Sequence, residues 1–144
     1  TVATGSAPQS VTIHPAGRYA YVANQAGSVS QYTIGANGSL TPMTTATVAA
    51  GSTPLSVTVD PSGKYAYVAN SGSNNVSQYT MARDGSLTMM AAPTVASGAG
   101  SRSVTVDPSG KYAYVVNWSG HTVSQYTIGS NGALTPMTVA TVPA

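Results

Sequence analysis

Charged and redox-active residues are scarce in this sequence. Its 144 residues include five Lys and Arg, three Asp, no Glu and no Cys, so that charged residues make up 6%, against roughly 25% in an ordinary soluble domain. Without Cys there is no disulfide framework, zinc–thiolate site or cysteine nucleophile. No apolar run is long enough to span a membrane. A net charge of +2 from five scattered cations also lacks the basic patch typical of nucleic-acid-binding proteins.

What the sequence does have is a threefold internal repeat. The segment Tyr19–Asn24 returns as Tyr65–Asn70 and, with one Ala→Val change, as Tyr112–Asn117. The nine tyrosines fall three to each repeat. We therefore expect one domain covering 1–144, with repeats at approximately 1–46, 47–93 and 94–144.

Each repeat is interpreted as four β-strands. Alternation of apolar and polar residues predicts the strands of the first repeat, at Gln9–Ile13, Tyr19–Ala23, Val29–Ile34 and about 40–49. A turn such as Asp60-Pro-Ser-Gly-Lys64 joins the first two strands, with Pro, Asp and Gly at positions that favour tight turns. Asn-Gly or Asp-Gly hairpins join the last two. Because Pro42 and Pro136 cannot donate to a ladder, the fourth strand is expected at a sheet edge.

A unit of about 46 residues with four antiparallel strands is typical of a β-propeller blade. A β-solenoid has shorter repeats, and a sandwich would not repeat so closely. We therefore predict an all-β protein, a β-propeller segment of three four-stranded antiparallel blades that form part of a ring. Face-to-face packing of blades also explains the shortage of charge.

The motifs resemble those of the YVTN family of β-propeller repeats, relatives of lactonase-like seven-bladed propellers. The resemblance rests on Ser56-Val-Thr-Val-Asp-Pro-Ser-Gly-Lys-Tyr-Ala-Tyr-Val-Ala-Asn70, Val29-Ser-Gln-Tyr-Thr33 and Asn37-Gly-Ser-Leu-Thr-Pro42, and it extends over nearly the whole chain. It implies a propeller fold. Members of the family range from 6-phosphogluconolactonase-like enzymes to secreted and surface-layer proteins without known catalysis, so the resemblance implies no single activity.

Three blades make only part of a ring, since the resemblance implies closure with about seven. Each open flank would present about 350 Å² of sheet, and two such faces exceed what a soluble monomer usually exposes. We expect self-association through these faces. A dimer would give six blades, whereas a head-to-tail contact that does not close would give a filament. The alternative is that the segment belongs to a longer propeller chain.

The third repeat carries the candidate binding residues. In a propeller, the loops before the first strand and between the second and third strands share one rim, here called the loop rim; the other turns form the turn rim. By analogy of fold, ligands meet the loop rim, where the third repeat brings Arg102, Asn117, Trp118 and His121. An aromatic platform beside a guanidinium and an imidazole suits a glycan, another small ligand or an anion. Alternatively, Trp118 fills a gap to the next blade and the two basic side chains are solvated.

One asparagine recurs at the same position of every repeat, as Asn24, Asn70 and Asn117. These amides would either line the rim as a ring or end the second strand by bonding the loop backbone. We favour the structural interpretation.

No catalytic set is evident. The three carboxylates are unpaired, and the sequence has no nucleophile elbow, phosphate loop or metal-spaced His pair. We expect no metal and no cofactor, and we favour an exported, non-catalytic scaffold or adhesion module whose blade faces drive self-assembly. Scarce charge and Ser/Thr-rich strands fit a bacterial extracellular or cell-surface location. The alternatives are a carbohydrate- or small-ligand-binding propeller and a lactonase-like hydrolase.

Overall fold

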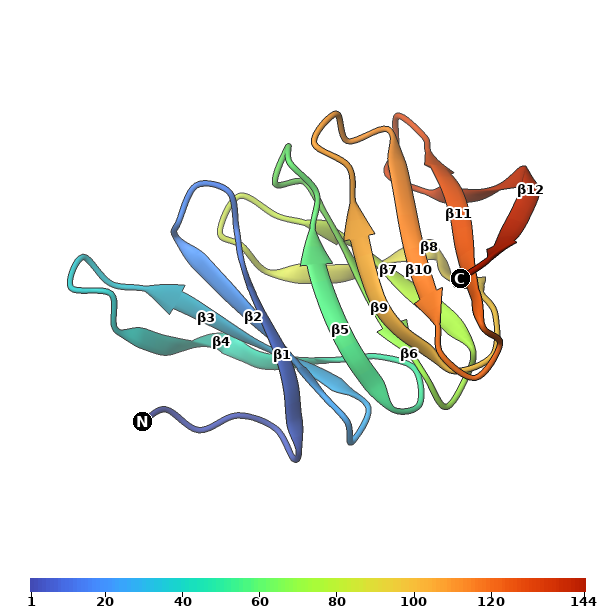
Figure 1. Cartoon of the computed structure of the whole chain (residues 1–144). Coiled ribbons are helices and arrows are strands. Elements are labelled where there is room, and N and C mark those ends of the chain that lie inside the picture. The colour runs from blue at the N-terminus through green and yellow to red at the C-terminus, as the bar shows by residue number, and fades with distance from the viewer.

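The computed structural model describes residues 1–144 and contains twelve strands without a helix. Three four-stranded antiparallel sheets follow one another along the chain (Figure 1). Their strands are β1 (Pro8–Ile13), β2 (Tyr19–Asn24), β3 (Ser28–Ile34), β4 (Leu40–Ala49); β5 (Pro54–Val59), β6 (Tyr65–Asn70), β7 (Asn75–Met81), β8 (Leu87–Ala96); and β9 (Ser101–Val106), β10 (Tyr112–Asn117), β11 (Thr122–Ile128), β12 (Leu134–Pro143). The all-β prediction of three four-stranded blades is confirmed. No helix is present that could cross a membrane.

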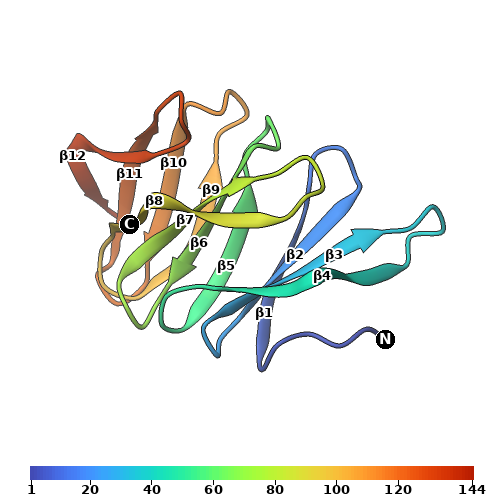
Figure 2. The ribbon, with the colours of Figure 1, turned by 180° about the vertical axis from the view of Figure 1, so that it is seen from behind.

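The sheets fan out around their first strands. Strand β5 packs against β1 on one side and β9 on the other, whereas the outer strands β4, β8 and β12 diverge (Figures 1 and 2). Each outer strand pairs only with the strand before it, so the expected edge position of the proline-containing strand is confirmed. The first strands therefore lie nearest the axis about which the blades are arranged, as in a propeller.

The turn between the first and second strands is held by one side chain. In the third blade Asp107 accepts the backbone amides of Lys111 and Tyr112 through Oδ1, both at 2.9 Å, and the Ser109 hydroxyl at 2.5 Å through Oδ2. These hydrogen bonds, that of Ser109 above all, lower the pKa of Asp107 to about 2. His14 stands at this position in the first blade and accepts a single amide through Nδ1.

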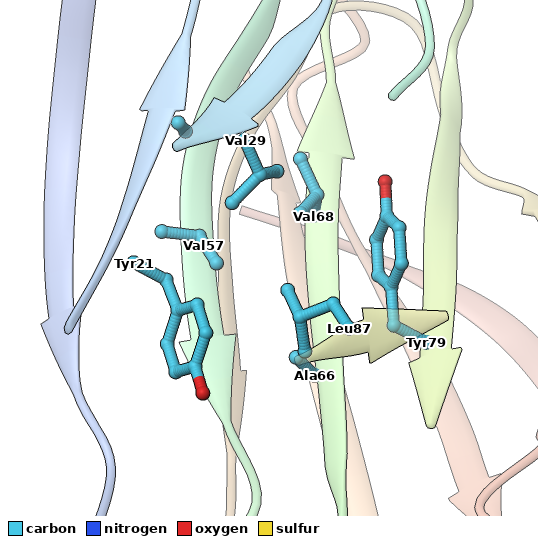
Figure 3. Close-up of a cluster of buried hydrophobic side chains, with 8 residues drawn as sticks. Tyr21, Val29, Val57, Ala66, Val68, Tyr79 and Leu87 are labelled. Atoms are coloured by element: carbon cyan, nitrogen blue, oxygen red, sulfur yellow. The ribbon is translucent and has the colours of Figure 1, made fainter. Parts of the chain in front are cut away.

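Buried side chains fill each junction between blades. Side chains alternate along a strand, so Tyr21 faces the second blade while Ala20 faces the open flank of the first. Figure 3 shows the cluster at the first junction, formed by Tyr21 and Val29 from one blade and Val57, Ala66, Val68, Tyr79 and Leu87 from the next. The core of the molecule therefore lies between the sheets.

The same hydrogen bonds cross both junctions. The Tyr21 hydroxyl donates to the Gly85 carbonyl at 2.6 Å, and the Leu87 amide donates to Oε1 of Gln31 at 2.7 Å. The second junction repeats them, from Tyr67 to Gly132 at 2.7 Å and from Leu134 to Gln78 at 2.6 Å. Each blade thus offers one set of polar groups to the blade before it and a different set to the blade after it.

The buried tyrosines predict a defined alkaline limit of stability. Burial raises the pKa of Tyr79 to about 12 and raises the pKa values of Tyr21, Tyr67 and Tyr126 above their usual range, which is near 10. The protonated side chains therefore stabilise the fold below about pH 10, and this contribution is lost as pH rises from about 10 through about 12. We expect these four tyrosines to ionise only as β-sheet circular dichroism disappears.

The measurement is tyrosinate absorbance followed together with circular dichroism. In denaturant all nine tyrosines should titrate near pH 10. Ionisation of all nine near pH 10 with the sheets intact would contradict the burial described here.

Candidate functional site

The loop rim lies at the lower edge of the molecule in Figure 1, where each first strand begins. Pairing in the third blade steps from Ser103 to Ser101, so Arg102 is a β-bulge residue. The same bulge in the other two blades leaves Gln9 and Leu55 unpaired. Bulges re-aim side chains locally, and this one occupies the innermost strand of every blade. A position whose side chain differs in every repeat thus lies beside the axis.

Arg102 and Trp118 form a stacked pair on this rim. The guanidinium carbon of Arg102 lies 5.8 Å from the centre of the Trp118 ring, within cation–π range, and the Trp118 side chain is 65% exposed. The equivalent residues of the first blade also meet, since Nε2 of Gln9 donates to Oε1 of Gln25 at 3.3 Å. The structure therefore brings two of the candidate residues together and leaves the indole open to solvent.

His121 belongs to the same loop but its imidazole makes no contact with that pair. Its amide donates to the Trp118 carbonyl at 3.4 Å, and its backbone has a φ of 49°. At the same position in the second blade, Oδ1 of Asn74 accepts the amide of Gly100 at 2.8 Å. A side chain here therefore reaches toward the following blade, and His121 lies on the open flank.

Asn117 is fully buried inside its blade. Its Nδ2 donates to Oγ1 of Thr122 at 3.1 Å and to Oγ of Ser124 at 2.8 Å, and its Oδ1 has no partner in the chain. The expected bonds from Asn117 to the loop backbone do not form. Because Asn117 pairs with Thr122 across the sheet, its amide meets hydroxyls of β11 instead. Asn24 repeats the arrangement with two serine hydroxyls, and Asn70 donates to Oδ1 of Asn75 and to Oγ of Ser77.

The carboxylates lie on the other rim. Asp60 and Asp107 sit in turns between first and second strands, and Asp84 sits between β7 and β8. Hydrogen bonds from Ser86 lower the pKa of Asp84. No group of three or more His, Asp or Glu residues is placed to hold a metal ion. The loop rim therefore presents a guanidinium, an indole and an imidazole, which can bind a polar or anionic ligand and accept one proton.

Sequence reasoning missed a second group of residues, on the turn rim. A cavity of about 390 Å³ between the first two blades is lined by His14, Arg18, Lys64 and Arg83 among others. Departures from the repeat pattern mark these residues in the sequence. His14 replaces the Asp found in the second and third repeats, and Arg83 stands where the first and third repeats carry Ala and Ser.

Solved structures with the same fold include two named as putative 6-phosphogluconolactonases. The protein from Bacteroides fragilis is 25% identical with a TM-score of 0.88, over 99% of this chain and 41% of that one. The protein from Bacteroides uniformis is 21% identical, also with a TM-score of 0.88, over 99% of this chain and 42% of that one. A periplasmic gluconolactonase from Pseudomonas aeruginosa is 19% identical with a TM-score of 0.80, over 99% and 41% of the respective chains.

The chain thus spans about two-fifths of the length of these solved proteins. Among curated proteins no sequence matches it. The family model described as "Lactonase, 7-bladed beta-propeller" matches residues 1–144, and the chain therefore belongs to the lactonase family of seven-bladed β-propellers.

Proposed function

We propose that the chain supplies three blades of a closed propeller that binds a sugar lactone on its loop rim and hydrolyses it. The observation that carries the proposal is the lactonase-family match over all 144 residues. The names of similar structures, putative 6-phosphogluconolactonase and gluconolactonase, suggest the substrate class. The narrower YVTN-repeat resemblance remains a prediction.

Each rim side chain has a role suited to its chemistry. The exposed indole of Trp118 offers an apolar face to the sugar ring. The Arg102 guanidinium, stacked on it, donates hydrogen bonds to the lactone carbonyl oxygen, where negative charge grows as water attacks. His121 is the only imidazole on this rim; for it to take the proton of the attacking water, its side chain must turn from the open flank toward Arg102. The ring C–O bond then breaks, and the departing oxygen takes up that proton to give a hydroxy acid.

This function requires a complete ring, and the two open flanks are the counterparts of the flanks that meet within the chain. On the first blade Val11 is 62% exposed, whereas its counterparts Val57 and Val104 are 5% and 4% exposed because a preceding blade covers them. On the third blade Val116 is 42% exposed, where the equivalent Ala23 is fully buried. Each flank is therefore one half of an interface that already occurs twice within the chain.

The polar groups of the two flanks also match. The Tyr114 hydroxyl and Oε1 of Gln125, counterparts of Tyr67 and Gln78, have no partner on the open third blade. The open flank of the first blade carries the Gly38 carbonyl and the Leu40 amide. They are the counterparts of the carbonyl that accepts from a tyrosine, and of the amide that donates to a glutamine, at each junction within the chain. A second copy docked head to tail satisfies both, and two copies close a ring of six blades.

The chain's own N-terminal segment occupies one site on this flank. The Tyr32 hydroxyl donates to the Ala3 carbonyl at 2.6 Å, as Tyr79 does to Ala49 at the end of the preceding β4. In a head-to-tail pair the end of β12 from the second copy takes the place of residues 1–3. Removal of residues 1–4 should therefore strengthen association.

A non-catalytic scaffold is the second candidate, and one observation favours it. All three carboxylates lie on the turn rim, where hydrogen bonds within turns engage them. The loop rim of these three blades consequently has no carboxylate to assist proton transfer. In this alternative the chain self-assembles, as an exported adhesion or scaffold module, without turning over a substrate.

A lactone assay separates the two functions. Glucono-δ-lactone and its 6-phosphate should be hydrolysed above the buffer rate by the unmodified chain, and fluorescence of Trp118, the only Trp, should respond to the lactone. Arg102→Ala with His121→Ala should abolish turnover, while Lys111→Ala, which removes a cation from the turn rim, should leave it unchanged. No turnover across the panel and a flat Trp118 signal would eliminate the lactone function and leave the scaffold.

A further inference from the structure

The cavity on the turn rim gathers most of the positive charge of the chain. It is lined by residues at the turns that join β1 to β2, β5 to β6 and β7 to β8. The first and the last of these turns lie side by side in both views (Figures 1 and 2). Arg18, Lys64 and Arg83 line it, and they are three of the five Lys and Arg residues in the sequence. Such a concentration in a charge-poor chain requires an explanation.

The backbone around the cavity is held in place from both blades. The Tyr19 hydroxyl donates to the Arg83 carbonyl at 3.1 Å, and the Tyr19 ring lies 5.7 Å from the guanidinium carbon of Arg18. The His14 ring meets Tyr19 edge to face, with 5.6 Å between ring centres, and its Nε2 donates to the Gly63 carbonyl at 3.2 Å. The cations therefore extend from a fixed frame, which lowers the entropy lost when a ligand binds.

The nearby carboxylates do not neutralise these cations. Asp60 accepts the amides of Lys64 and Tyr65 at 2.9 and 2.8 Å, and Asp84 accepts the Ser86 hydroxyl at 2.7 Å. Neither carboxylate lines the cavity. Hydrogen bonds within their own turns hold both acids, and the only charged side chains that line the cavity are the three cations.

The second junction provides an internal comparison. Its equivalent cavity, of about 220 Å³, is lined by Asp60, Lys64 and Ser130 among others, and therefore contains one carboxylate and one cation. His14 replaces the carboxylate at the first junction, and Arg83 replaces the serine. In addition, Lys64 lines the first cavity, whereas its counterpart Lys111 does not line the second. Differences at three positions thus separate a pocket with one carboxylate and one cation from a pocket with three cations.

We propose that the first-junction cavity binds a phosphate or sulfate group, either as the free ion or carried on a larger ligand. The guanidinium groups of Arg18 and Arg83 donate paired hydrogen bonds to its oxygens, which is the geometry that favours Arg for such oxyanions, and the Lys64 ammonium adds a point charge. The site lies on the rim opposite Arg102 and Trp118 and does not depend on lactone hydrolysis.

The test is an NMR titration of the full chain with inorganic phosphate, with inorganic sulfate and with glucose 6-phosphate. Glucose is the control for glucose 6-phosphate, and NaCl holds the ionic strength constant. We expect saturable shifts of the amides of 16–18 and 82–85, with half-saturation on the order of 1 mM. Arg83→Ser, which installs the residue found at the second junction, should raise the dissociation constant at least about tenfold, because a charge-assisted pair is lost. Arg102→Ala removes the same charge from the loop rim and should change nothing.

A response to inorganic ions identifies a site for the free ion, and tighter binding of glucose 6-phosphate identifies a site for a phosphorylated sugar. Both outcomes support the proposal. Shifts that stay linear with concentration, shifts that NaCl alone reproduces, or equal weakening by Arg83→Ser and Arg102→Ala would overturn it. The dispersion of the NMR spectra reports whether each variant is folded.

Discussion

Replacing Gly132 with Ala should lower the free energy of unfolding by about 2–5 kcal/mol. Gly132 has a φ of 80°, and a Cβ built on it runs into the ring of Tyr65 in the neighbouring blade. The left-handed backbone costs an L-residue about 1–2 kcal/mol, and overpacking of a junction costs about 1–3 kcal/mol more. Urea unfolding followed by circular dichroism at low protein concentration measures the loss.

Gly38 is the matched control for that substitution. It occupies the same turn position in the first blade with a φ of 78°, but no atom lies within 4 Å of a Cβ built there. Gly38→Ala should therefore lower the stability of the monomer only by the backbone strain of about 1–2 kcal/mol. Equal losses at Gly38 and Gly132 would contradict tight packing of the Tyr65 ring on this turn.

The same Gly38→Ala change should prevent head-to-tail association. In the proposed pair, Tyr112 of the second copy meets Gly38 as Tyr65 meets Gly132, so the added methyl group collides at the new junction. A penalty of about 2 kcal/mol at each of the two new junctions raises the dissociation constant of the pair roughly 900-fold. Sedimentation over a range of protein concentrations measures this shift, while circular dichroism reports on the fold.

Gly17→Ala controls for backbone strain in the association experiment. Gly17 has a φ of 69°, and no atom lies within 4 Å of a Cβ built on it. Its counterpart Gly110 shows what a neighbouring blade would bring: a Cβ there would meet only Pro61, at 3.8 Å, which is an ordinary contact. This variant should associate like the unmodified chain. If it loses association as fully as Gly38→Ala does, strain within the turns and not the collision is responsible.

Local chemistry was enough to predict the strands and turns. The alternation in Gln9–Ile13 predicted a strand and the proline at position 42 predicted an edge strand, and the structure contains both. The Asp-Pro-Ser-Gly-Lys turns form with their Asp accepting backbone amides, as short-range preferences require. These features depend on residues within a few positions of each other, which the sequence displays directly.

Contacts between blades were beyond such reasoning. The Tyr21 hydroxyl finds its acceptor 64 residues further along the chain, at Gly85, and Arg18 and Arg83 line one cavity at the same junction. Both depend on which turn of one blade lies beside which turn of the next. Asn117 was likewise expected to bond its loop, but its amide points across the sheet to hydroxyls of β11. The stack of Arg102 on Trp118 was anticipated only as a shared rim position.

The solution mass of the unmodified chain tests the central claim most directly. If each blade needs a neighbour on both flanks and the two flanks are complementary, light scattering at micromolar concentration should give twice the chain mass of 14.4 kDa, with β-sheet circular dichroism intact. A single species of 14.4 kDa that keeps its sheets at every concentration would contradict the account, because Val11, Val116 and Tyr114 would then remain stably exposed to water.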